Sequence, residues 1–79
     1  MKARITVTLK PGVLDPQGQA ITGSLKSLGF ADVGLVRQGK VFDIDIPESD
    51  PTDARVALAA MCEKLLANTV IENYAIELV

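Results

Sequence analysis

Cys62 is the one residue of this chain whose type is suited to act as a nucleophile. A reactive thiolate needs a base or a cation beside it, and the sequence contains no histidine. Cys62 instead lies among apolar residues with helical spacing, which is typical of a small buried side chain. One cysteine without histidine also excludes an internal disulfide and the common zinc sites. We therefore predict no catalytic residue and no metal site.

Two further patterns would carry chemistry in another setting. Asp43 and Asp45 share one face of a predicted strand, but an acid/base pair needs surroundings that separate the two pKa values. An exposed strand face beside cations does not provide them, so we interpret both as solvated. Gly34 and Gly39 are too far apart for a phosphate-binding loop, and neither opens a helix. The chain is expected to bind no cofactor itself.

Length and charge limit the remaining functions. Seventy-nine residues make one small domain, and we predict a single domain over residues 1–79. The net charge of −2 argues against a nucleic-acid-binding protein, which would present a basic surface. Apolar runs never approach the ~20 residues of a membrane span, and the N-terminal residues do not form a signal peptide. We therefore expect a cytoplasmic protein with no membrane or nucleic-acid partner.

The elements follow from hydrophobic periodicity. Alternating apolar residues predict strands over residues 2–10 and 73–78, while residues 33–46 predict a hairpin with a tight turn at Gln38-Gly39. Asp-Pro pairs at residues 15–16 and 50–51 predict two helix starts. Gly29 is expected to end the first helix. In the second helix, the expected apolar stripe includes Ala54, Ala57, Leu58, Met61 and Leu65, flanked by Cys62 and Leu66.

The resulting order, β-α-β-β-α-β, predicts an α+β fold of the ferredoxin-like type. Its four-stranded antiparallel sheet would carry both helices on one face. The cations of the first strand would then lie beside Asp43, Asp45 and Glu77 and pair with them across strands. The other sheet face and the apolar residues 33–36 would stay open, and the core is small, so we expect self-association.

Gly18 and Gly23 fall inside the first predicted helix, where glycine is unfavourable by about 1 kcal/mol relative to alanine. Two interpretations stay open. Either another segment approaches the helix closely at these positions, or an exposed helix simply tolerates them.

Three segments carry a more specific signal. Residues 13–18 read VLDPQG, residues 36–40 read VRQGK, and residues 62–74 read CEKLLANTVIENY. Together they resemble PurS, the small subunit of the multi-subunit phosphoribosylformylglycinamidine synthase of bacteria and archaea. The resemblance covers essentially the whole chain, and the stretch LANTVIE is its most specific part.

The resemblance implies a role in purine synthesis without catalysis by this chain alone. The complex converts formylglycinamide ribonucleotide, glutamine and ATP into formylglycinamidine ribonucleotide. The small subunit would bridge a glutaminase subunit and a large ATP-dependent synthetase subunit, so that ammonia reaches the synthetase site. ATP and magnesium are expected on the synthetase partner. Family members alone form dimers or dimers of dimers, so the same is expected here.

Partner contacts are expected where the matched motifs and the apolar run fall outside the core. Simpler roles also fit several of these residues, since Asp15 suits a helix cap, Gly39 a turn and Asn68 a helix end. The candidates are Asp15, Gln17, Gly18, Val33, Leu35, Val36, Arg37, Gly39, Lys40, Asn68, Thr69 and Glu72.

The alternative function is an amino-acid-sensing regulatory domain of the same strand order, which would bind effectors between paired domains. A chain without an attached enzyme fits that function less well. An acylphosphatase-like enzyme would need an arginine in the loop after the first strand, and residues 11–14 contain none.

Overall fold

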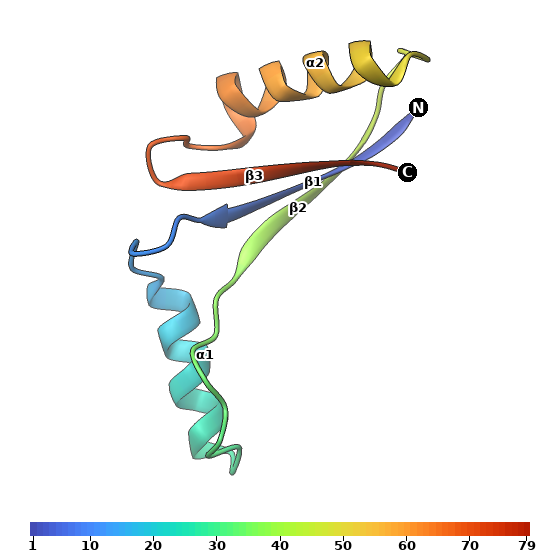
Figure 1. The fold of residues 1–79 in the computed structure, drawn as a ribbon. Helices are drawn as coiled ribbons and strands as arrows, with labels where there is room; N and C mark the ends of the chain where they lie inside the picture. Colours follow the sequence, from blue (N-terminus) through green and yellow to red (C-terminus); the bar gives the residue numbers. More distant parts are fainter.

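Three strands and two α-helices make up the computed structural model, which describes residues 1–79. The chain order is β1 (Lys2–Leu9), α1 (Pro16–Ser27), β2 (Gly39–Asp45), α2 (Pro51–Met61), the π-helical turn η1 (Cys62–Leu66) and β3 (Glu72–Leu78). The sheet order is β2-β1-β3, and both pairings are antiparallel (Figure 1). The first strand is therefore the central one, as predicted.

The predicted fourth strand at residues 33–37 is wrong, and with it the four-stranded ferredoxin-like sheet. These residues instead run back along α1 as an extended segment (Figure 1). The backbone N–H of Val36 donates to the Thr22 hydroxyl of α1 at 2.9 Å, rather than to a neighbouring strand. No tight turn forms at Gln38-Gly39, because Gly39 already begins β2. The Thr22 side chain of α1 thus accepts a hydrogen bond that the backbone of a neighbouring strand would accept in a β-sheet.

The core lies between β1 and α2, which covers one face of the sheet (Figure 1). Asp50 caps α2 by accepting from the backbone of Thr52 at 2.8 Å, which confirms the predicted Asp-Pro start. The opposite sheet face carries Arg4 and Asp43, which pair across β1 and β2. The buried apolar cluster consists of Ala3, Ile5, Val7, Ile46, Ala54, Leu58, Cys62 and Ala67.

A π-helical turn changes the apolar stripe at the end of α2. The backbone N–H of Ala67 donates to the carbonyl of Cys62 at 3.0 Å, which encloses one residue more than an α-helical turn does. Cys62 and Ala67 stay buried, whereas Leu65 is 82% exposed. The predicted placement of Leu65 in the core is therefore wrong, since the wider turn rotates it toward solvent.

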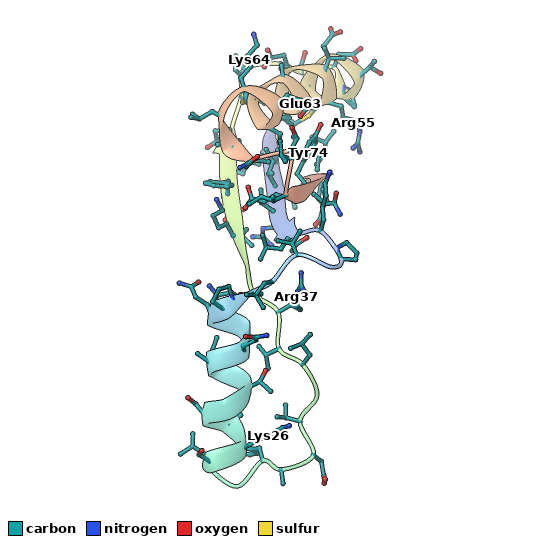
Figure 2. The ribbon with its side chains drawn as sticks, turned by 90° about the vertical axis from the view of Figure 1, so that its left-hand side faces the viewer. Lys26, Arg37, Arg55, Glu63, Lys64 and Tyr74 are labelled. Atoms are coloured by element: carbon teal, nitrogen blue, oxygen red, sulfur yellow. The ribbon has the colours of Figure 1, made fainter.

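The prediction that α1 packs on the sheet is also wrong. Residues 10–38, which we call the arm, project away from the sheet as α1 and the segment that returns beside it (Figures 1 and 2). Gly29 ends α1 with a positive φ of 104°, as predicted. The radius of gyration is 15.9 Å, against about 11–12 Å for a compact chain of this length. The arm leaves five large apolar side chains exposed: Leu14, Ile21, Leu28, Phe30 and Leu35.

Cross-strand charge pairing is confirmed at Arg4. Its Nε donates to Oδ1 of Asp43 at 2.9 Å across β1 and β2, and β3 places Glu77 opposite Arg4 on the other side. The hydrogen bond and charge of Arg4 lower the pKa of the Asp43 carboxyl below its ordinary value. Both side chains are exposed, so the pair adds little to stability. None of the helices has the length and apolar composition to cross a bilayer.

Candidate functional site

Four chain segments meet where the arm leaves the sheet, and we call this junction the arm root. Antiparallel pairing brings the end of β1 beside the starts of β2 and β3, with Thr8 opposite Gly39 and Leu9 opposite Glu72. The first turn of α1 completes the junction. A cleft of about 200 Å³ lies there, and five predicted contact residues line it: Asp15, Gln17, Gly39, Lys40 and Glu72.

Asp15 joins α1 to the returning segment. Its side chain is buried, and Oδ1 accepts from the backbone N–H of Gly18 at 2.8 Å, as expected of a helix cap. Oδ2 accepts a second bond, from the backbone N–H of Gln38 at 3.0 Å. The bonds from Gln38 and Gly18, together with the charge of Arg37, lower the pKa of the Asp15 carboxyl. The predicted capping role is therefore confirmed and is only part of what Asp15 does.

Gly18 allows the returning segment to approach α1 closely. A Cβ at this position would overlap the backbone carbonyl oxygen of Val36, whereas a Cβ at Gly23 would meet nothing within 4 Å. The Thr22 hydroxyl lies between these backbones, donating to the carbonyl of Gly18 at 2.8 Å and accepting from Val36. The close approach at Gly18 is thus made by the chain itself, and Gly23 is a tolerated glycine.

Arg37 and Lys40 do not flank a tight turn, which corrects their predicted setting. The Arg37 guanidinium donates to the carbonyls of Leu9 and Lys10 at 3.4 and 3.2 Å, so it lies against the end of β1 (Figure 2). Lys40 lies within β2, and its Nζ is 3.7 Å from Oε2 of Glu72 in β3. Both cations therefore tie segments of the arm root together.

The loop before β3 is held by its own hydrogen bonds. Asn68 Oδ1 accepts from the N–H of Val70 at 3.2 Å, and the N–H of Asn68 donates to Oε1 of Glu72 at 2.6 Å. The loop joins the arm root because the N–H of Lys10 donates to the carbonyl of Ile71 at 2.9 Å. These bonds leave Thr69 and Val70 exposed at the surface.

The remaining predicted contact residues lie along the arm. Val33 lines a hollow of about 430 Å³ near the arm's far end, together with Leu25 and Phe30. Leu35 is exposed, and Val36 faces α1 through its backbone. The structure therefore separates the candidates into a polar set at the arm root and an apolar set on the arm.

Comparison with known proteins decides the family. Residues 2–79 match the family model PurS, described as phosphoribosylformylglycinamidine (FGAM) synthase. The chain belongs to the PurS family. It is 49% identical over 76 residues to PurS of Bacillus subtilis, covering 96% of this chain and 89% of that one. PurS of Synechocystis is 48% identical over 75 residues, covering 95% of this chain and 75% of the relative.

Solved PurS structures share the fold described above. The crystal structure of B. subtilis PurS has a TM-score of 0.87 at 49% identity and covers 96% of this chain and 94% of its own. A chain in the structure of PurLQS from Thermotoga maritima has a TM-score of 0.88 at 29% identity, covering 96% and 93%. The protein is thus a PurS subunit of FGAM synthase, of purine biosynthesis, and the alternative of an amino-acid-sensing domain is not supported.

Cys62 lies in the core of this PurS chain, next to Leu58 in the buried cluster, as predicted. Burial, with the charge of Glu63, raises the pKa of its thiol, which keeps the thiol protonated and unreactive. No three potential metal-binding side chains lie together. Nothing in this arrangement activates a nucleophile.

Two residues that hold the arm together were missed from the sequence: Thr22 within α1 and Gln38 at the arm root. Thr22 carried a signal, because a threonine inside a helix, one turn after a glycine, is placed to bond the preceding turn through its hydroxyl. Gln38 carried none, since it contributes its backbone N–H and no side-chain chemistry to Asp15.

Proposed function

We propose that this chain is the non-catalytic bridging subunit of FGAM synthase. It holds a glutaminase subunit, PurQ, against the ATP-dependent synthetase subunit, PurL, so that ammonia from glutamine reaches the synthetase site. The observation that carries this proposal is that the chain exposes two separate surfaces: five large apolar side chains lie uncovered on the projecting arm, and Thr69 and Val70 lie uncovered at the arm root. Surfaces of this kind mark protein–protein contacts. The resemblance to a chain in the PurLQS structure supports it.

The chain contributes surface rather than chemistry. The thiol of Cys62 is buried and protonated, and the carboxylate of Asp15 is engaged by two backbone N–H groups. ATP and magnesium would accordingly be bound by the synthetase. The assembly would work in the cytoplasm, which fits an enzyme of purine biosynthesis.

Self-association would cover the apolar set on the arm. A hollow of about 410 Å³ lies between β2 and the end of α2, lined by Ile44, Ala60, Met61, Lys64, Leu65 and Leu66. The predicted fold would have placed the first helix over this part of the sheet face, and α1 is instead extended away from it. The arm of a second copy would supply the missing cover, giving a dimer or a dimer of dimers.

The polar set at the arm root would receive the glutaminase. Thr69 and Val70 are exposed on a loop whose backbone is already held by hydrogen bonds, so docking would require little ordering. Val70 is 81% exposed, and Val79, at the end of the chain after β3, is 72% exposed. These two valines make a matched pair for a test.

The test compares Val70→Asp with Val79→Asp in the complex reconstituted with both partner subunits. We expect Val70→Asp to reduce glutamine-dependent activity at least fivefold while activity with added ammonia is unchanged, because ammonia bypasses docking of the glutaminase. Val79→Asp should leave both activities within twofold of the wild type.

Two results would contradict the proposal in different ways. Equal loss of both activities in Val70→Asp would place the arm root against the synthetase instead. Full glutamine-dependent activity in the complete absence of this chain would overturn the bridging role itself.

A further inference from the structure

We propose that the Asp15 carboxylate is a latch that fixes the direction of the arm relative to the sheet. One oxygen holds the first turn of α1, and the other holds the residue at which the chain re-enters the sheet. The latch is a property of the chain itself and stands whether or not the arm root receives a glutaminase.

The second hydrogen bond of Asp15 matters because of where Gln38 lies in the chain. Gln38 immediately precedes Gly39, which begins β2 and pairs with Thr8 of β1. The bond from the N–H of Gln38 to Oδ2 of Asp15, at 3.0 Å, therefore ties the start of α1 to the residue that immediately precedes the sheet. Asp15 is only 5% exposed, so water does not compete for these bonds as it would at the surface.

Few other contacts would set the arm's direction. The arm joins the sheet through two backbone connections, one after β1 and one before β2, and the first contains Gly12 with a positive φ of 85°. Besides Asp15, two exposed side chains bond across the root: the Gln38 amide donates to Oε1 of Gln17, and the Arg37 guanidinium donates to the carbonyls of Leu9 and Lys10 at 3.4 and 3.2 Å. The N–H of Lys10 also donates to the carbonyl of Ile71 at 2.9 Å. The bond from the Gln38 N–H to Asp15 is partly buried, whereas the bonds of the Gln38 and Arg37 side chains are exposed to water. Losing it would therefore leave these exposed contacts and the Lys10 bond to restrain the root.

The second helix shows that a cap alone does not need two oxygens. Both helices begin with Asp-Pro, but Asp50 uses Oδ1 for both of its bonds, from Thr52 at 2.8 Å and Asp53 at 3.3 Å. Asp50 is exposed and bonds no other segment. The same local motif therefore caps both helices, and only Asp15 adds a bond to a distant part of the chain.

This difference makes the latch separable from the cap. In Asp15→Asn the amide has one oxygen that accepts, and its nitrogen would face a backbone N–H as donor against donor. Asparagine and serine cap helices about as well as aspartate, so the oxygen stays on Gly18 and Gln38 loses its acceptor. Asp15→Ser acts in the same way, since its single hydroxyl is taken up by the cap.

Acid should release the latch without any substitution. The charged groups around Asp15 are Arg37 from the returning segment, with Lys40 of β2 and Glu72 of β3 lining the same cleft. The pKa of Asp15 is lowered in the folded chain, so its stabilisation is complete above the ordinary value of about 3.9 and is lost as the pH falls through the lowered value. The latch therefore stays closed at neutral pH and opens only at a pH below the ordinary pKa of this carboxyl.

Amide hydrogen exchange of the full chain tests the latch directly. In Asp15→Asn and Asp15→Ser we expect the Gln38 amide to exchange at least tenfold faster, while the amides of Gly18, Ile5 and Val7 stay within threefold of the wild type. Asp50→Asn is the matched control and should leave Gln38 unchanged. A Gln38 amide that keeps its protection in both Asp15 variants overturns the latch.

A distance measurement tests the direction of the arm. Spin labels at Ser27→Cys and Val79→Cys, in a Cys62→Ala background diluted with unlabelled chain, should give one narrow distance distribution, which broadens at least twofold with Asp15→Asn. Should that variant fail to fold, Asp15→Ser in the same labelled chain should show the same broadening. A distribution that stays narrow in a folded Asp15 variant overturns the proposal.

Discussion

Gly18 and Gly23 both lie in α1, but their α-carbons have opposite surroundings. A methyl group on Gly18 would overlap the backbone carbonyl of Val36, which has no rotamer by which to move away. We expect Gly18→Ala to lower the free energy of unfolding by about 1–3 kcal/mol, as overpacking does. Gly23→Ala meets open space and should raise it by about 0.5–1 kcal/mol, because alanine favours the helix. Urea denaturation of both variants measures the difference, and equal effects would contradict the close approach at Gly18.

Cys62 should behave as a core residue and not as a reactive thiol. Its side chain is buried and burial raises its pKa, so little thiolate forms at neutral pH. We expect a thiol reagent to modify the native chain at least a hundredfold more slowly than the urea-unfolded chain. Cys62→Ala should retain glutamine-dependent activity within twofold in the reconstituted complex. A larger loss in an assembled variant would show that the thiol takes part in the reaction.

At the scale of elements, the π-helical turn separates two leucines that the apolar stripe had grouped together. Leu58 is fully buried against β1, whereas Leu65 follows the wider turn and faces solvent. We expect Leu58→Ala to cost about 2–5 kcal/mol of unfolding free energy, through lost burial and a cavity. Leu65→Ala should change it by less than about 0.5 kcal/mol in the dissociated chain. Chemical denaturation at low protein concentration distinguishes them, and similar costs would mean that no such turn forms.

The elements also show how far sequence reasoning reaches. Both Asp-Pro starts, the glycine that ends α1 and the alternation of β1 and β3 depend on local chemistry, and they were predicted correctly. The structure of the apolar run at residues 33–36 was not predicted correctly. A hydrophobic pattern indicates which side chains avoid water, but it does not indicate which neighbouring backbone the segment lies beside. Val36 lies beside α1 because Thr22 accepts its N–H and Gly18 leaves room for its carbonyl. The arm root depends on such distant contacts, so only its capping was readable from the sequence.

At the scale of the whole molecule, the exposed arm predicts concentration-dependent stability. Apolar side chains that pack on a second copy stabilise the folded chain by mass action, so the melting temperature should rise with protein concentration. Leu35 on the arm and Val56 on α2 are matched for a test, with exposures of 66% and 67%. We expect Leu35→Lys to weaken self-association at least tenfold in analytical ultracentrifugation and to remove the concentration dependence. Val56→Lys should do neither, and equal effects would place the contact elsewhere than on the arm.

The position of β1 at the centre of the sheet also determines the order in which the chain acquires its structure. Of the three strands, β1 comes first in the chain and pairs with both others, yet β2 follows only after the whole arm, and Ala3 of β1 pairs with Leu78 of β3. Ile5 and Val7 therefore lack their β3 partners, Ile76 and Tyr74, until the last strand has been synthesised. Sheets built from such distant pairs fold more slowly than helical bundles, whose contacts are local. The helices, whose hydrogen bonds are local, should form before the sheet on which α2 packs.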